Sequence, residues 1–238
     1  MNIVISQPMF LPWLGLFEQI SLSDVFVHYD DVQLPQGRSF ISRVQIKTKD
    51  KISWLTVPID RKNSGKLINQ IIFKESESWR KKHLACIKQN YIKCSFYDDM
   101  LPIAEAIYGF NTENLSAFNI NAIEIVAKWL GLKTQFYKSS DLRIPGEGSL
   151  RLADICNNFN AKSYITGLGA LNYLDYSIFE NKGIKVNYMN YQKTEYQQLF
   201  GKFIPFVTIL DVIANCGKNS KQLICSESVY WKDYKKDE

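Results

Sequence analysis

The chain has 238 residues, of which 46% are hydrophobic and 22% are charged, and these proportions are ordinary for a globular protein. Its formal net charge of +5 at pH 7 helps to attract phosphorylated ligands, but it is too small to indicate a nucleic-acid-binding protein. No run of 18 apolar residues occurs, so we expect no membrane-spanning segment.

The first thirty residues show a strand, helix and strand pattern. Residues 3–5 form a short apolar run that Gln7 and Pro8 close, and apolar residues then recur at helical spacing over residues 13–20. A second apolar run, residues 25–27, ends at Asp30 and Asp31. Such a unit is typical of a parallel β-sheet.

The next segment, residues 33–73, is polar and is interrupted by short apolar runs. We expect it to form a β insertion built from short strands. A helical middle follows, with helices expected over residues 78–91, 100–108 and 116–130.

Strands and helices alternate again in the remaining part of the chain. The patterns predict strands at residues 135–137, 163–166 and 184–188, and helices at residues 149–159, 176–181 and 208–215. We therefore predict one α/β domain over residues 1–238, with a mostly parallel, Rossmann-like sheet and flanking helices.

An odd number of cysteines, five, and the absence of any CxxC pair favour free thiols in a reducing cytosol. The N-terminus has no basic segment followed by a long apolar run, so no signal peptide is expected. Together these features predict a cytoplasmic protein. The cysteine spacings do not fit a metal site, and we predict none.

A series of short motifs, spread over roughly residues 3 to 217, resembles the WbqC-like family of bacterial surface-polysaccharide gene clusters. The motifs are residues 7–15 (QPMFLPWLG), 24–27, 30–33, 38–40 and 54–58, then Trp79 with His83, residues 139–140, 173–174, 196–197 and 209–211. One position departs from the family pattern, because Ser6 stands where the family usually has His.

The resemblance implies work on activated sugars in the cytoplasm. The role that it implies is transfer of an acyl or aminoacyl group to an amino sugar nucleotide, with acyl-CoA or an acyl carrier protein thioester as the donor. Two other classes stay open: a nucleotide-dependent ligase or nucleotidyltransferase that uses Mg²⁺, and a non-catalytic module that binds a sugar nucleotide or a carrier protein.

Candidate ligand-binding residues follow the predicted strands, because ligands of open α/β sheets bind at the carboxyl ends of strands. Asp30 and Asp31 are candidate acid-base groups or ligands of a metal or a ribose, and their alternative role is that of solvated turn residues. The other candidates at strand ends or the following helix are Gln7, Trp13, Ser139, Ser140 and Gly167.

Basic and aromatic residues complete the predicted site. Arg38, Arg43 and Lys47 are candidates for binding a pyrophosphate, or form a solvated basic loop. His83 is the most natural general base in the chain, although a lone histidine on a helix is more often structural. Stacking or hydroxyl contacts are expected from Tyr173, Tyr196 and Gln197. We expect Gln7, Asp31, Arg43 and Ser140 to share one pocket.

Overall fold

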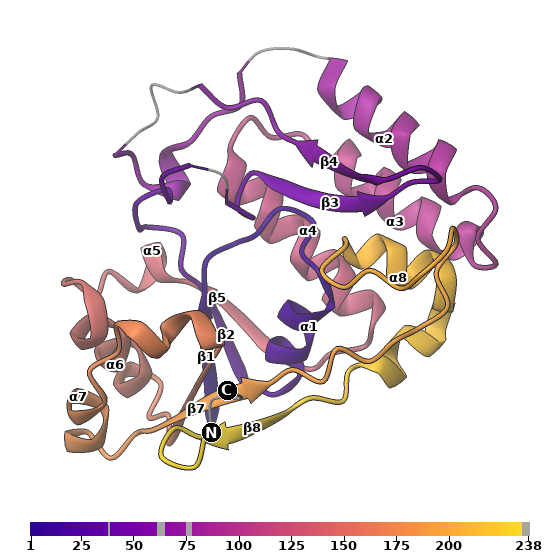
Figure 1. Ribbon diagram of the computed structural model, residues 1–238. Helices are drawn as coiled ribbons and strands as arrows, with labels where there is room; N and C mark the ends of the chain where they lie inside the picture. Colours follow the sequence, from indigo (N-terminus) through magenta and orange to yellow (C-terminus); the bar gives the residue numbers. More distant parts are fainter. Residues whose placement is uncertain (38, 61–64, 75–77, 235–238) are drawn as a thin grey trace.

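The computed structural model describes residues 1–37, 39–60, 65–74 and 78–234, and Figure 1 shows their arrangement. A six-stranded sheet lies at the centre, with the strand order β5-β2-β1-β6-β7-β8. Neighbouring strands are parallel except for β8, which is antiparallel to β7. The strands are β1 (Asn2–Ser6), β2 (Val25–His28), β5 (Gln135–Lys138), β6 (Ser163–Thr166), β7 (Lys185–Asn190) and β8 (Glu227–Tyr230). The predicted α/β class with a mostly parallel sheet is confirmed.

The strand order reverses between β1 and β6. The chain runs outward from β1 through β2 to β5 on one side, then crosses back to β6 and continues through β7 to β8. This is the order of a doubly wound sheet, in which ligands bind beyond the carboxyl ends of the strands at the point of reversal.

Alternate residues of the central strands enter two separate apolar cores. Val4 and Phe26 contact one core, whereas Ile3 and Val25 contact the other, because successive side chains of a strand point to opposite faces. Helices α1 (Leu14–Ser21) and α4 (Leu115–Trp129) cover the first face. Helices α6 (Gly148–Asn158) and α7 (Tyr176–Asn181) cover the second, at the lower left of Figure 1.

The long excursion between β2 and β5 contains the predicted β insertion and the helical middle. Strands β3 (Arg43–Lys47) and β4 (Ile52–Thr56) pair with each other in a separate antiparallel sheet. The short helix η2 (Ile68–Gln70) and the helices α2 (Ser78–Tyr91) and α3 (Tyr97–Gly109) follow. The apolar run at residues 71–73 forms only isolated bridges, Ile72 with Asn114 and Phe73 with Ile59.

The C-terminal part returns across the insertion to the sheet. Thr208 caps α8 (Ile209–Cys216), and its backbone N–H donates to Gln45 of β3. The helix η4 (Gly217–Leu223) leads to β8, an edge strand that the sequence patterns did not predict. No helix within the described residues is both long and apolar enough to cross a membrane.

Candidate functional site

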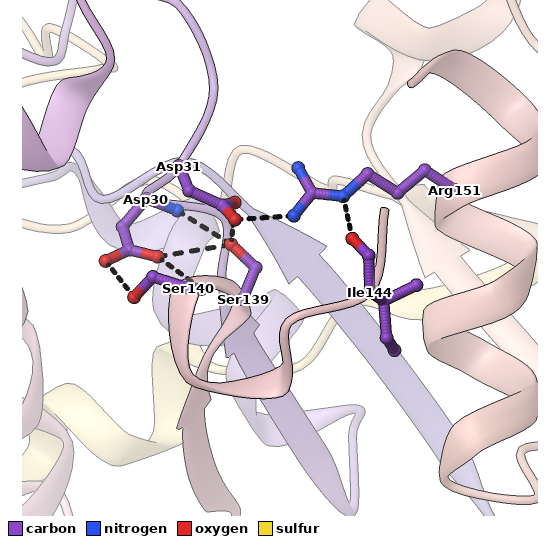
Figure 2. A network of polar contacts seen from close by, with 6 residues as sticks. All are labelled: Asp30, Asp31, Ser139, Ser140, Ile144 and Arg151. Atoms are coloured by element: carbon purple, nitrogen blue, oxygen red, sulfur yellow. Dashed lines mark hydrogen bonds and ion pairs between the residues drawn. The ribbon is translucent and has the colours of Figure 1, made fainter. Parts of the chain in front are cut away.

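Two polar segments leave the sheet side by side at its carboxyl edge. The last residues of β2 and β5, His28 and Lys138, are register partners of adjacent parallel strands. Asp30 and Asp31 therefore emerge next to Ser139 and Ser140, which open the short helix α5 (Ser139–Leu142). Figure 2 shows the resulting network of polar contacts.

Asp30 is buried, and protein donors engage both of its carboxylate oxygens. The backbone N–H and the hydroxyl of Ser140 donate to it at 3.0 and 2.8 Å. Its own backbone N–H donates to the Ser139 hydroxyl at 3.1 Å, and its carbonyl accepts from Asn69 of η2 at 2.9 Å. Asp30 thus ties β2, α5 and η2 together, and this environment favours a structural role for it.

Asp31 is the more accessible carboxylate, with 19% of its side chain exposed. The Ser139 hydroxyl donates to one oxygen at 2.6 Å, and Arg151 of α6 pairs with the other at 2.5 Å. Arg151 is held in turn, because its Nε–H donates to the carbonyl of Ile144 at 2.9 Å (Figure 2). Its guanidinium carbon also lies 5.1 Å from the centre of the Tyr29 ring. The carboxylate therefore has a fixed position at the edge of the sheet.

These contacts keep Asp31 ionised. Burial by itself raises the pKa of the Asp31 carboxyl, but hydrogen bonds from Arg151 and Ser139 outweigh burial, and the net shift is downward. Burial raises the pKa of the Tyr29 phenol, so it stays protonated at neutral pH. The site thus holds an ionised Asp31 carboxylate paired with the Arg151 guanidinium. Near pH 7 this carboxylate accepts hydrogen bonds and does not exchange protons.

The point where the strand order reverses carries two further predicted residues, Gln7 after β1 and Gly167 after β6. Gly167 allows a close approach of α1, because a Cβ atom at this position would meet Nε2 of Gln19 at 3.0 Å. The backbone φ of Gly167 is −86°, which other residues also adopt, and a side chain here would have to move only the end of the Gln19 side chain.

Tyr173 follows the short helix η3 (Leu168–Asn172) and is 63% exposed. It lines a surface depression of about 550 Å³, together with residues of α7 and with Trp231. This depression is lined by none of Gln7, Asp31, Arg43 and Ser140, and the same is true of a small cavity beside Tyr191 and Tyr196. Of the predicted residues, the structure brings Asp30, Asp31, Ser139 and Ser140 into contact at the carboxyl edge of the sheet.

Two of the predicted basic residues, Arg43 and Lys47, lie on β3 in the insertion. Arg43 belongs to β3, and its guanidinium carbon lies 3.3 Å from the centre of the Trp54 ring. Lys47 is buried, and its ammonium group donates to Gln198 and to the carbonyls of Gly201 and Lys202. These acceptors match all three of its N–H groups, which favours a structural role. Arg38 lies outside the described residues.

His83 lies in an aromatic cluster of the insertion and the helical middle. Its Nδ1 is 3.2 Å from the Tyr108 hydroxyl, and its ring contacts Phe10 and Trp79. Burial lowers the pKa of His83 to about 4, against a smaller upward effect of a backbone hydrogen bond with Thr56. No contact within the described part of the chain joins His83 to the carboxylate network, so its catalytic role stays a prediction.

The other predicted aromatic residues are packed against protein groups. Trp13 contacts the rings of Tyr191 and Phe206, and it covers Gly15, where a Cβ atom would lie 1.9 Å from the indole. The Tyr196 hydroxyl donates to Asp211 at 2.8 Å. Its neighbour Gln197 is exposed.

The sequence patterns missed two residues that organise polar groups. Arg151 lies on a helix that was predicted, but nothing local indicates that its partner is Asp31. Gln198 is buried and contacts Lys47, Tyr196 and Ile204, whereas the adjacent Gln197 was the one predicted to bind. A long polar side chain inside a predicted core helix is the only signal that points to Arg151.

Comparison with known proteins agrees with the motif series. An uncharacterized protein of Mycobacterium tuberculosis, Rv1507c, is 30% identical over 220 residues, which cover 91% of this chain and 94% of that protein. No solved structure matches the chain. Residues 7–223 match the WbqC-like protein family, and the chain therefore belongs to that family.

Proposed function

We propose that this protein is a cytoplasmic enzyme of surface-polysaccharide sugar biosynthesis that transfers an acyl or aminoacyl group to an amino sugar nucleotide. The observation that carries the proposal is the Asp31 carboxylate, which is partly exposed and held by Arg151 and Ser139 at the carboxyl edge of the sheet. Family membership supports a role with bacterial surface glycans.

The sheet supports a nucleotide-bearing substrate. Its order reverses between β1 and β6, and doubly wound sheets of this order bind nucleotides beyond the carboxyl ends of the strands. The loops after β1, β2, β5 and β6 all open at that edge, and they carry Gln7, Asp31, Ser140 and Gly167. This support comes from similarity of fold, and a fold alone does not determine a reaction. The proposed reaction therefore depends on the chemistry of Asp31.

In the proposed reaction the substrate amine attacks the carbonyl carbon of a thioester donor. A C–N bond forms, the C–S bond breaks, and the proton that the amine loses goes to the departing thiolate. Asp31 accepts a hydrogen bond from the amine and orients its lone pair toward the carbonyl. This role suits a carboxylate whose pKa is lowered, because the group must remain charged rather than exchange a proton.

A ligand screen separates the proposed function from its alternatives. Thermal shifts are measured with dTDP-, UDP- and GDP-sugars, and in parallel with acyl-CoA, an acyl carrier protein, and ATP with Mg²⁺. The proposal predicts stabilisation by a sugar nucleotide and by a thioester donor. Stabilisation by ATP with Mg²⁺ alone favours a ligase or nucleotidyltransferase, and binding of a sugar nucleotide without turnover favours a binding module.

Substitution of Asp31 then tests the site itself. Asp31→Asn keeps the size of the side chain and removes the charge that orients the amine, and we expect turnover to fall roughly a hundredfold. Asp154→Asn is the matched control, because Asp154 lies on α6 and pairs with the half-exposed Lys182. An unchanged turnover in Asp31→Asn would remove Asp31 from the reaction.

A further inference from the structure

The depression beside α7 lies outside the carboxylate network and combines flat aromatic surface with fixed hydrogen-bond acceptors. Its volume of about 550 Å³ is within the usual range of small-ligand sites. Tyr173, Asp175, Tyr176, Glu180 and Trp231 contribute to its wall. We propose that this depression binds a neutral pyranose ring of a saccharide.

The aromatic part of the wall is rigid. The rings of Tyr176 and Trp231 are stacked, with centroids 3.9 Å apart and an angle of 7° between their planes. The hydroxyl of Tyr176 is held 2.8 Å from that of Tyr188 in the core. Tyr173, which is mostly exposed, extends the aromatic surface. The apolar C–H face of a pyranose ring suits such a surface.

Protein donors hold the carboxylates of Asp175 and Glu180 in place, and in each carboxylate both contacts are made by a single oxygen. Asp175 Oδ1 accepts from the backbone N–H and the hydroxyl of Ser177, at 3.0 and 2.6 Å. Glu180 Oε1 accepts from the hydroxyl of Tyr230 and pairs with Lys232, at 3.0 and 2.8 Å. The second oxygen of Asp175 has no hydrogen-bond partner among the described residues, so a sugar hydroxyl can donate to it without displacing a protein donor.

The charge of the wall selects against anionic ligands. The hydrogen bond with Lys232 lowers the pKa of Glu180, which keeps that group ionised, and Lys232 is already paired with it. A phosphate inside the depression would therefore meet carboxylates, whereas the neutral hydroxyls of a sugar would meet acceptors. The proposal thus places the sugar ring of a sugar nucleotide in the depression and its phosphates outside it. A purely apolar ligand would leave those acceptors unused.

Tyr173 follows β6 and η3 on the chain, beyond the carboxyl end of the sheet where the candidate active site lies. The loop after β2 opens at the same edge, and its Tyr29 contacts Arg151, the partner of Asp31. The inference rests on the proposed function in one respect, namely that the bound saccharide is the substrate of the reaction at Asp31.

Saturation-transfer NMR on the full-length protein tests the inference. The probes are methyl β-D-glucopyranoside, methyl N-acetyl-β-D-glucosaminide, UDP-N-acetylglucosamine and UDP. We expect saturation of the sugar-ring protons of the first three probes by the wild-type protein. The two methyl glycosides separate binding of the ring itself from binding through the nucleotide, and UDP reports the nucleotide alone.

Two variants and one control locate the binding. Tyr173→Ala removes exposed aromatic surface, and Asp175→Asn removes a charged acceptor while Asn still caps α7. Both are expected to weaken binding of the methyl glycosides at least fivefold. Phe110→Ala, at another exposed aromatic residue, is expected to bind them as the wild type does.

Methyl glycosides that bind both variants as tightly as the wild type, or that fail to bind the wild type, would overturn the inference. Failure of the proposed function has a different result, because saccharide binding then persists while no activated sugar is turned over. If an activated sugar is turned over but no methyl glycoside binds, the saccharide site in the depression is wrong and the proposed function stands.

Discussion

Arg151 and Asp31 are 120 residues apart in sequence and form an ion pair of 2.5 Å at the carboxyl edge of the sheet. Asp31 follows β2, and Arg151 lies in the first turns of α6, after the crossover from β5. The pair therefore joins two parts of the fold that only the parallel sheet brings together. The contribution of this ion pair to the stability of the fold can be tested by substitution.

Removal of one partner of this pair should destabilise the fold. In Arg151→Met the Asp31 carboxylate loses its cation, and the Ile144 carbonyl loses its donor. Since only 7% of the Arg151 side chain is exposed, we expect a loss of about 2–4 kcal/mol in the free energy of unfolding. Urea denaturation measures this loss.

The control is another ion pair, between Asp154 of α6 and Lys182 at the end of α7. Lys182 and Asp154 are 31% and 37% exposed, so Lys182→Ala should cost less than about 1 kcal/mol. Equal losses in Arg151→Met and Lys182→Ala would show that the Arg151 pair is an ordinary surface contact.

His83 should make the protein less stable in mild acid. Its pKa is lowered from 6.5 to about 4 in the folded protein, so between these values the unfolded chain binds more protons. Stability is then fully present above pH 6.5 and falls as the pH approaches 4, by on the order of 3 kcal/mol. Comparison of wild type with His83→Gln by urea denaturation across this range isolates the effect, because Gln does not titrate. Parallel curves for the two proteins would contradict the buried environment of His83.

Glu18 of α1 should change the stability of the protein with pH in the direction opposite to that of His83. It is buried, and it accepts backbone N–H groups of Cys225 and Ser226, at 3.2 and 3.0 Å, next to the segment that leads to β8. Burial raises the pKa of Glu18 above its ordinary value of 4.5, so the folded protein binds more protons and loses stability as the pH rises through this range.

Glu18→Gln keeps an oxygen acceptor and removes the charge. We expect it to equal or exceed the wild type in stability at pH 7, and the wild type to gain relative to it as the pH falls toward 4.5. Glu18→Ala, which removes the acceptor as well, should be destabilised at both pH values. Thermal unfolding at pH 4.5 and 7 distinguishes the three proteins, and a Gln variant as unstable as the Ala variant at pH 7 would refute the account.

Lys47 distinguishes a structural amine from a phosphate ligand. Its ammonium group holds the loop at Gly201 and Lys202, and burial lowers its pKa against the opposing effect of Asp211. Lys47→Met should therefore cost roughly 2–4 kcal/mol of stability, whereas the exposed Lys51→Met should cost almost nothing. A Lys47→Met protein of normal stability and reduced affinity for a sugar nucleotide would restore the predicted role in phosphate binding.

The fold could be predicted largely because its central strands are short apolar runs between helical patterns. The β1–α1–β2 unit, the insertion and the later alternation all follow from periodicity. Strand β8 could not be predicted in this way, since Glu227–Tyr230 is a four-residue edge strand whose side chains are all at least partly exposed. Its place depends on contacts with β7 and not on its own pattern. The assignment of a single domain remains a prediction.

The site could be predicted only where topology decides it. Asp31 and Ser139 were both expected at strand ends, and the adjacency of β2 and β5 brings them into contact. Burial of Lys47 was not visible, because β3 breaks its alternation there and buries Ile46 and Lys47 in succession. Arg151 was missed because residue type does not reveal a partner so distant in sequence.

Hydrogen–deuterium exchange with the sugar nucleotide that gives the largest thermal shift tests the central claim most directly. If the substrate binds at the carboxyl edge beside Asp31, the amides of residues 29–33, 139–142 and 167–173 should become protected on binding. Protection confined to β3 and β4, with these three segments unchanged, would place the site elsewhere and contradict the account.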